Sequence, residues 1–107
     1  MANLLGAKIK KLRKAKQLTL EQLAGQIGSG KSYIWELENR GVKRPSAEKL
    51  AAIARALDTT TDFLVDNAMT RPTDAIKREV FFRKFDRLDK ADQRKIEEII
   101  EAWSKPK

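Results

Sequence analysis

The side chains best suited to chemistry lie in residues 31–39, a segment predicted to be a short helix. One side of its helical wheel carries Ile34, Leu37 and Glu38, and the other carries Ser32, Trp35, Glu36 and Asn39, with Lys31 at the N-terminal end. The second side is free to face a ligand. Lysine and serine can donate to guanine N7 and O6, glutamate can accept from cytosine N4, and tryptophan can press on a thymine methyl group. This helix therefore offers the chemistry that reads the edges of nucleic acid bases.

An excess of positive charge lies in the same half of the chain. The 107 residues include 23 Lys and Arg against 15 Asp and Glu, which gives a formal net charge of +8. Residues 1–44 hold ten of the basic residues and three of the acidic ones, whereas residues 45–107 are nearly balanced. Such an excess indicates a polyanionic partner, usually nucleic acid. The lysines of residues 8–16 also fit the alternative of a solvated helix face.

Two missing residue types exclude whole classes of site. Without Cys there is no disulfide, thiolate nucleophile or Cys-ligated metal, and without His the commonest general base and metal ligand is absent. An enzyme built on a lysine or a carboxylate pair has no support from a Gly-rich or metal-binding motif. We therefore expect no enzyme, no cofactor and no metal. Apolar runs are short and no signal-type apolar block follows Met1, which predicts a cytoplasmic protein without a membrane partner.

Three predicted helices come first in the chain. Apolar residues at helical spacing predict a helix at 4–16. A capping box of Thr19 and Gln22 begins the second helix, which is expected to end about eight residues later. Gly28 suits the left-handed conformation that ends this helix before the one that carries the base-reading chemistry.

Two more helices complete the same unit. After the basic loop 40–44, Ser46 is a good N-cap for a helix whose apolar face includes Ile53. The short segment 61–65 adds further apolar residues to the same core. The sequence therefore predicts an all-α fold in which residues 1–66 form a five-helix bundle.

The remainder of the chain is predicted to be a connector, residues 67–73, and a C-terminal helical extension, residues 74–107. Its aromatic residues, Phe81, Phe82, Phe85 and Trp103, are expected to pack against other apolar groups rather than to form a cofactor-binding box. The last helix carries an apolar stripe at helical spacing: Ile96, Ile99, Ile100 and Trp103. This stripe must be covered by the five-helix bundle or by a second copy of the chain, and we predict that it is a dimer interface.

Residues 20–39 predict a helix-turn-helix, because Ala24 allows two helices to cross closely and Gly28 makes the turn. Ile34 and Leu37 anchor the second helix to the core. The sequence here resembles the Cro/repressor, or XRE, family of bacterial and phage regulators. The resemblance covers roughly residues 4–65 and is carried by Thr19 to Ala24, Gly28, Tyr33-Ile34, Leu37-Glu38-Asn39, Arg44-Pro45-Ser46, Ala51 to Leu57 and Asp62-Phe63-Leu64.

The resemblance implies that the third helix enters the major groove of DNA, while the second lies across the backbone with its N-terminus aimed at a phosphate. Carried over by position, the base-contacting residues are Lys31, Ser32, Trp35 and Glu36. Phosphate contacts are implied for the backbone at Leu20, for Lys43 and Arg44 in the loop and for Ser46, and the basic loop residue Arg40 can neutralise a phosphate as well. Many members have Gln where this chain has Leu20, so only the backbone contact carries over there. Arg13 and Glu38 match a pair that is salt-bridged in some members.

We therefore expect a sequence-specific DNA-binding transcriptional regulator, a repressor that binds a pseudo-palindromic operator as a homodimer. The alternative is an antitoxin-like module in which residues 74–103 bind a partner protein and DNA binding serves autoregulation. Partial packing against the bundle is the alternative for Tyr33 and Trp35. A solvated charge is the alternative for Glu36.

Overall fold

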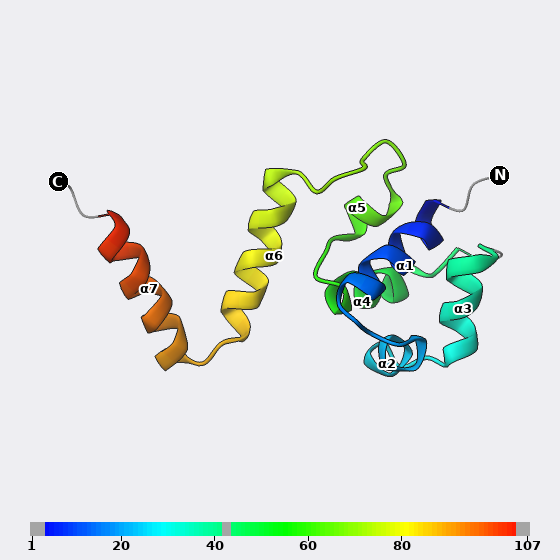
Figure 1. Ribbon diagram of the computed structural model, residues 1–107, viewed down its shortest axis with the longest axis horizontal. Helices are drawn as coiled ribbons and strands as arrows, with labels where there is room; N and C mark the ends of the chain where they lie inside the picture. Colours follow the sequence, from blue (N-terminus) through cyan, green and yellow to red (C-terminus); the bar gives the residue numbers. More distant parts are fainter. Residues whose placement is uncertain (1–3, 42–43, 105–107) are drawn as a thin grey trace.

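Seven α-helices and no strand make up residues 4–41 and 44–104, the part of the chain that the computed structural model describes. In chain order they are α1 (Leu4–Ala15), α2 (Leu20–Gln26), α3 (Lys31–Asn39), α4 (Ala47–Ala56), α5 (Thr61–Val65), α6 (Asp74–Arg87) and α7 (Lys90–Ser104) (Figure 1). The prediction of an all-α fold is confirmed. The first helix ends one residue earlier than predicted, because the chain turns at Gln17, where φ is 58°.

Hydroxyl side chains set the beginnings of four helices. In each case the oxygen accepts a hydrogen bond of 3.0 to 3.2 Å from the backbone N–H three residues later: Thr19 for α2, Ser46 for α4, Thr60 for α5 and Thr73 for α6. Thr19 and Gln22 form the predicted capping box. By contrast, α3 begins at Gly30 without a side-chain cap. Local sequence therefore fixes where most of these helices start.

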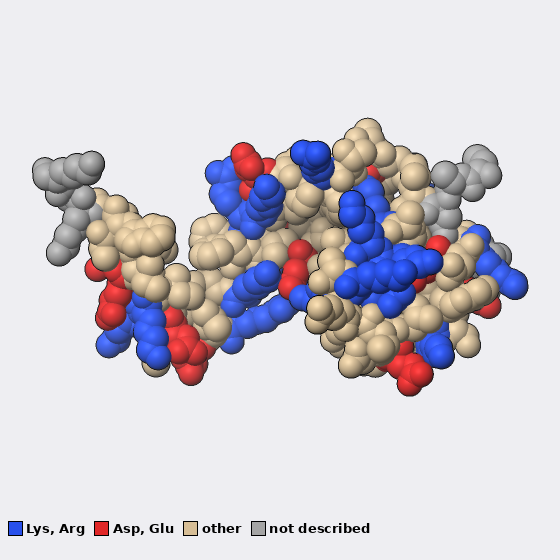
Figure 2. All heavy atoms as spheres, viewed as in Figure 1, with Lys and Arg blue, Asp and Glu red and all other residues tan. Residues whose placement is uncertain are grey.

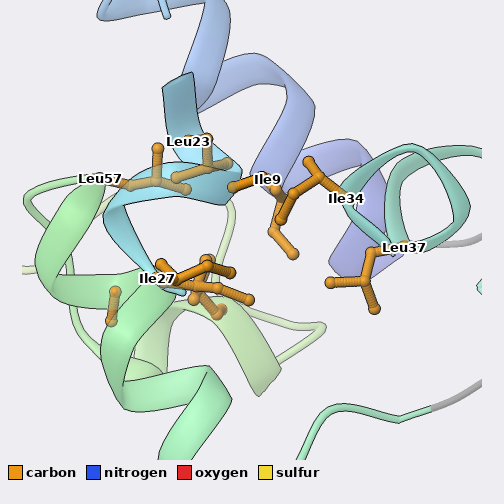
Figure 3. Close-up of a cluster of buried hydrophobic side chains, with 10 residues drawn as sticks. Ile9, Leu23, Ile27, Ile34, Leu37 and Leu57 are labelled. Atoms are coloured by element: carbon orange, nitrogen blue, oxygen red, sulfur yellow. The ribbon is translucent and has the colours of Figure 1, made fainter. Parts of the chain in front are cut away.

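The core is built from one fully buried aliphatic side chain on each of the first five helices. These are Ile9, Leu23, Ile34, Ile53 and Leu64. Around them lie Ala24, Ile27, Leu37, Ala54 and Leu57, and Figure 3 shows how side chains from α1, α2, α3 and α4 meet. Burying each large side chain stabilises the fold by roughly 1.5 to 3 kcal/mol. The outer face of α3 can remain exposed because its inner face is anchored here.

Helices α6 and α7, called the arm below, extend away from this bundle (Figure 1). The radius of gyration is 16.6 Å, against about 13 Å for a compact domain of this size. The arm meets the bundle through the buried Ile76 and through Arg83, whose guanidinium donates to the carbonyl of Thr59. Helix α7 follows α6 across a tight corner, where the Gln93 side chain donates to the carbonyls of Phe85 and Leu88.

Within a single chain the aromatic residues of the extension are only partly packed, so whether a second copy of the chain covers them stays a prediction. Phe81 and Phe82 are 48% and 58% exposed and Trp103 is 87% exposed. The ring centroid of Phe81 lies 5.6 Å from that of Phe82 and 6.4 Å from that of Phe85, and Phe81 also lines an open hollow together with Leu12 and Thr59 of the bundle. Nor does the apolar stripe of α7 pack on the bundle, because α7 lies apart from it and has no buried residue (Figure 1). Helical spacing identified an apolar face but could not identify what covers it.

Candidate nucleic-acid interface

The turn between α2 and α3 is fixed by backbone hydrogen bonds. Gly28 adopts a left-handed conformation with φ of 68°, and its N–H approaches the carbonyl of Gly25 at 3.4 Å. The next N–H, that of Ser29, donates to the carbonyl of Ala24 at 2.8 Å. These two bonds form a Schellman motif, which satisfies the last carbonyls of α2. The turn holds α3 at a fixed angle to α2 and gives the predicted helix-turn-helix.

A lysine from α4 secures the same turn. The Nζ of Lys49 lies 3.3 Å from the carbonyl of Ile27, donates to the hydroxyl of Ser29 and lies 5.7 Å from the ring centroid of Tyr33. Burial raises the pKa of the Tyr33 hydroxyl, which matches a ring partly packed against the bundle. These contacts could not be predicted from the sequence, because they join Lys49 to residues 16 to 22 positions earlier and nothing in the local pattern links them.

The inner face of α3 is tied to α1 by an ion pair. The Nε of Arg13 is 2.7 Å from Oε2 of Glu38, and its Nη2 is 3.0 Å from Oε1. The third guanidinium nitrogen donates to the carbonyl of Leu18 at 2.8 Å. The Glu38 side chain is 1% exposed and that of Arg13 is 11% exposed. The hydrogen bond to Glu38 raises the pKa of Arg13 above its usual value, despite the opposing effect of burial.

The outer face of α3 is exposed and slightly hollowed. Five side chains line a shallow depression of about 390 Å³: Lys31, Ser32, Trp35, Glu36 and Arg40. All five residues are exposed, and Trp35 keeps 43% of its surface accessible although it is large and apolar. The structure thus brings the four residues expected to contact bases together with Arg40 on one surface.

Two contacts orient side chains on this face. The Arg40 guanidinium lies 5.5 Å from the ring centroid of Trp35, within the range of a cation–π interaction. At the other end of α3, the Nζ of Lys31 is 3.7 Å from a carboxylate oxygen of Glu21 at the start of α2. Both partners of this pair are more than half exposed, so it is weak and can open when a ligand approaches. Neither contact was predicted from the sequence.

The residues expected to bind phosphates come from the end of α3, the loop that follows it and the starts of α2 and α4. Arg40, Arg44 and Ser46 are exposed, and the Ser46 hydroxyl also caps α4. Lys43 lies outside the described residues. The Leu20 side chain packs against the core, as expected from its apolar character, while its backbone begins α2 next to the capping box. A phosphate at that position would therefore meet backbone N–H groups rather than the side chain.

The apolar stripe expected to form a dimer interface lies on α7. On the arm, Ile99, Ile100 and Trp103 are exposed and Ile96 is partly buried. Among residues 4–41 and 44–104, no cluster of acidic side chains could hold a metal ion. The helices in these two ranges are all too short or too polar to span a membrane.

Comparison with known proteins places most of the bundle in one family. A family model described as helix-turn-helix matches residues 9–64. Over 58 residues the chain is 40% identical to the uncharacterised HTH-type transcriptional regulator YobD of Bacillus subtilis (strain 168), a match covering 54% of this chain and 51% of YobD. Over 63 residues it is 33% identical to the HTH-type transcriptional regulator SinR of the same organism, covering 59% and 57%. The chain thus matches about half the length of these curated relatives.

Solved structures extend the similarity to three dimensions. SinR in complex with DNA aligns with a TM-score of 0.55 and 34% identity over 58% of this chain and 98% of that one. The P22 c2 repressor bound to a synthetic operator aligns with a TM-score of 0.56 and 28% identity over 59% and 94%. A complex of SinR with SinI aligns with a TM-score of 0.57 and 25% identity over 91% and 94%. The repressor-like fold expected from the sequence is confirmed, and the chain belongs to the helix-turn-helix family.

Proposed function

We propose that this protein is a sequence-specific DNA-binding transcriptional regulator, a repressor that reads the major groove with α3. The observation that carries this proposal is the arrangement of α3, whose inner face is fixed by the core and by Arg13, while its outer face gathers donors, an acceptor and an aromatic ring. Groups that discriminate between bases must be held rigidly, because an error of an ångström breaks a hydrogen bond. An exposed tryptophan on such a face needs a partner surface.

The roles on the outer face follow from side-chain chemistry. Lys31, at the N-terminal end of α3, and Ser32 donate to guanine N7 or O6. Glu36 accepts from the amino group of cytosine, and Trp35 contacts a thymine methyl group or a sugar. Since Lys31 is paired with Glu21 in the free protein, contact with DNA exchanges that weak pair for a base or phosphate contact.

Phosphate contacts set the position of α3 on the duplex. Arg40 lies on the reading face itself, and the exposed Arg44 offers a second guanidinium group from the loop that follows α3. Lys43, which the sequence places in the same loop, is proposed as a third phosphate contact. Ser46 at the start of α4 and the backbone at Leu20 at the start of α2 add neutral donors. These contacts contribute affinity without sequence preference, and the assignment draws support from SinR and the P22 c2 repressor, which were solved as complexes with DNA.

We further propose that the regulator acts as a homodimer through the arm. The arm exposes a set of large apolar side chains: Phe81, Phe82, Ile99, Ile100 and Trp103. Such a surface is unfavourable in water unless another apolar surface covers it. Two copies joined through their arms place two α3 helices in successive major grooves, about 34 Å apart, on a pseudo-palindromic operator.

A second candidate is a protein-interaction role for the same arm, as in an antitoxin-like regulator. The apolar surface that favours a homodimer favours a different protein equally well. The alignment with the complex of SinR and SinI supports this candidate. It covers 91% of this chain, and SinR was solved there with a second protein bound. In this case DNA binding serves autoregulation and the arm recruits the partner.

Two measurements in the same buffer test sequence-specific recognition and the homodimer. The first is selection of bound sequences from a random duplex library, and the second is the mass of the protein by sedimentation. The proposal predicts enrichment of one motif with two-fold symmetry and a mass of two chains. Enrichment of a single half-site by a monomer contradicts the dimer. A failure to enrich any motif contradicts sequence-specific recognition.

A further inference from the structure

A second basic surface lies where the arm approaches the bundle, on the side away from α3 (Figure 1). It is an open hollow of about 500 Å³ between α6 and the ends of α1 and α4. Its charged lining comprises Lys16, Arg55, Asp58, Lys84 and Arg87. In Figure 2, basic side chains of α6 extend across this region toward the bundle. Four cationic groups thus converge on one concavity with a single acidic group.

Asp58 accounts for part of this charge but not for all of it. It accepts a hydrogen bond from Lys16 and lies 3.7 Å from the Nζ of Lys84. Burial opposes ionisation of this carboxyl, yet the hydrogen bond and charge of Lys16, together with Lys84 and Arg87, lower the pKa of Asp58 below its usual value. The carboxylate is therefore charged near neutral pH and already engaged by two lysines.

Three net positive charges remain in the hollow after Asp58 is counted. Arg55 on α4 and Arg87 on α6 are both exposed, and neither forms an ion pair with another described residue. Like charges that line one hollow repel one another, and Asp58 compensates only one of the four. An anion in the hollow would remove this repulsion.

We propose that this hollow binds a small anion bearing a phosphate group, of the size of a phosphorylated metabolite. Guanidinium groups match phosphate oxygens through paired N–H donors, and Arg55 and Arg87 offer two such groups from opposite walls. Lys16 and Lys84 add two further donors that are shared with Asp58. The phosphate of a small molecule is favoured over that of DNA, because α3 lies on the far side of the bundle (Figure 1).

Binding here would connect parts of the chain that have few direct contacts. The ligand would join Arg87 and Lys84 on the arm to Arg55 and Lys16 on the bundle. It would therefore fix the direction of the arm relative to the bundle and stabilise the folded state by an amount that grows with ligand concentration.

The proposal is tested by titrating the full chain with inorganic pyrophosphate at constant ionic strength. Amide NMR spectra recorded at each point report where pyrophosphate binds. Shifts are expected around Arg55, Asp58 and Arg87, with a rise in melting temperature. The double variant Arg55→Gln, Arg87→Gln should weaken pyrophosphate binding at least tenfold. A control variant, Arg78→Gln with Arg94→Gln, removes the same charge from exposed positions outside the hollow and should bind within twofold of the unaltered protein.

Each of the following three outcomes would contradict the proposal. Equal weakening in both double variants would mean that pyrophosphate responds only to net charge. Shifts confined to α3 and the loop at Arg44 would mean that the interface for DNA takes the anion instead. Shifts around Arg55 on addition of a DNA duplex, without any on addition of pyrophosphate, would assign the hollow to a DNA phosphate. None of these outcomes depends on whether α3 reads bases.

Discussion

Arg13 donates hydrogen bonds of 2.7 and 3.0 Å to the two carboxylate oxygens of Glu38, 25 residues away in the sequence. The pair joins the first helix to the inner face of the helix that carries the proposed base contacts. Its geometry is bidentate and the carboxylate is almost fully excluded from water. The position of α3 therefore depends on a polar contact as well as on the apolar core.

Replacing Arg13 with Ala should destabilise the protein by about 3 kcal/mol or more, because the buried Glu38 carboxylate loses two charge-assisted hydrogen bonds from the guanidinium. Denaturant unfolding measures the loss, and Lys14→Ala, which removes an exposed charge from the same helix, is the control. Affinity for a selected operator, measured where the variant remains folded, should change much less than stability. Unchanged stability with abolished DNA binding would contradict a structural role for the pair.

The two proposed classes of DNA contact should respond differently to mutation. Arg44→Ala should weaken binding to every duplex alike and reduce the salt dependence of binding by about one phosphate per protomer. Glu36→Gln should change which base is preferred at one operator position, by about 1 to 3 kcal/mol. Fluorescence anisotropy with a panel of single-base operator variants separates the two effects. Identical behaviour of the two variants would contradict the assignment of contacts.

Placing a charge on the apolar stripe of α7 should disrupt the proposed dimer. Ile99→Glu puts a carboxylate in the centre of the surface that two arms would share, where it cannot be solvated. Sedimentation should give the mass of one chain, with much weaker operator binding. Arg94→Glu puts the same side chain at an exposed position on the opposite side of α7 and should leave the mass of a dimer. An Ile99→Glu variant that still sediments as a dimer would exclude this interface.

Asp58 should make stability depend on acidity. Because the pKa of this carboxyl is lowered in the folded protein, chiefly by Lys16 working against burial, its stabilising contribution is complete above the usual value of 3.8. That contribution should disappear as the pH falls through the lower native value. Asn fits the left-handed backbone at this position, where φ is 55°, so Asp58→Asn removes the charge without strain. Denaturant midpoints of the two proteins should differ at pH 7 and converge in acid, whereas a constant difference would contradict the role of this ion pair.

Local signals in the sequence predicted much of the fold. The capping box at Thr19 and the glycine at position 28 set the helix-turn-helix through interactions within a few residues, which is why they could be recognised. The spacing of Ile34 and Leu37 likewise separated the inner face of α3 from its outer face.

Long-range polar contacts and the environment of the arm could not be predicted in the same way. Lys49 reaches the turn from α4, and only the folded chain brings it there. Phe81 and Phe82 were expected to be packed, yet about half of each stays exposed within one chain, and α6 contacts the bundle through Ile76, Arg83 and Lys84. Periodicity shows that a helix has an apolar face, whereas the choice among the bundle, a second copy and another protein depends on surfaces that lie outside the helix.

Trp35 offers the most direct test of the central claim that the outer face of α3 meets DNA. The chain has two tryptophans, so Trp103→Phe leaves Trp35 as the only one. In the free variant acrylamide should quench its fluorescence readily, since 43% of the residue is exposed. When the variant binds a selected operator, the emission of Trp35 should change and its ring should become strongly protected from acrylamide. An operator complex in which Trp35 remains as accessible as in the free protein would contradict contact between the outer face of α3 and DNA.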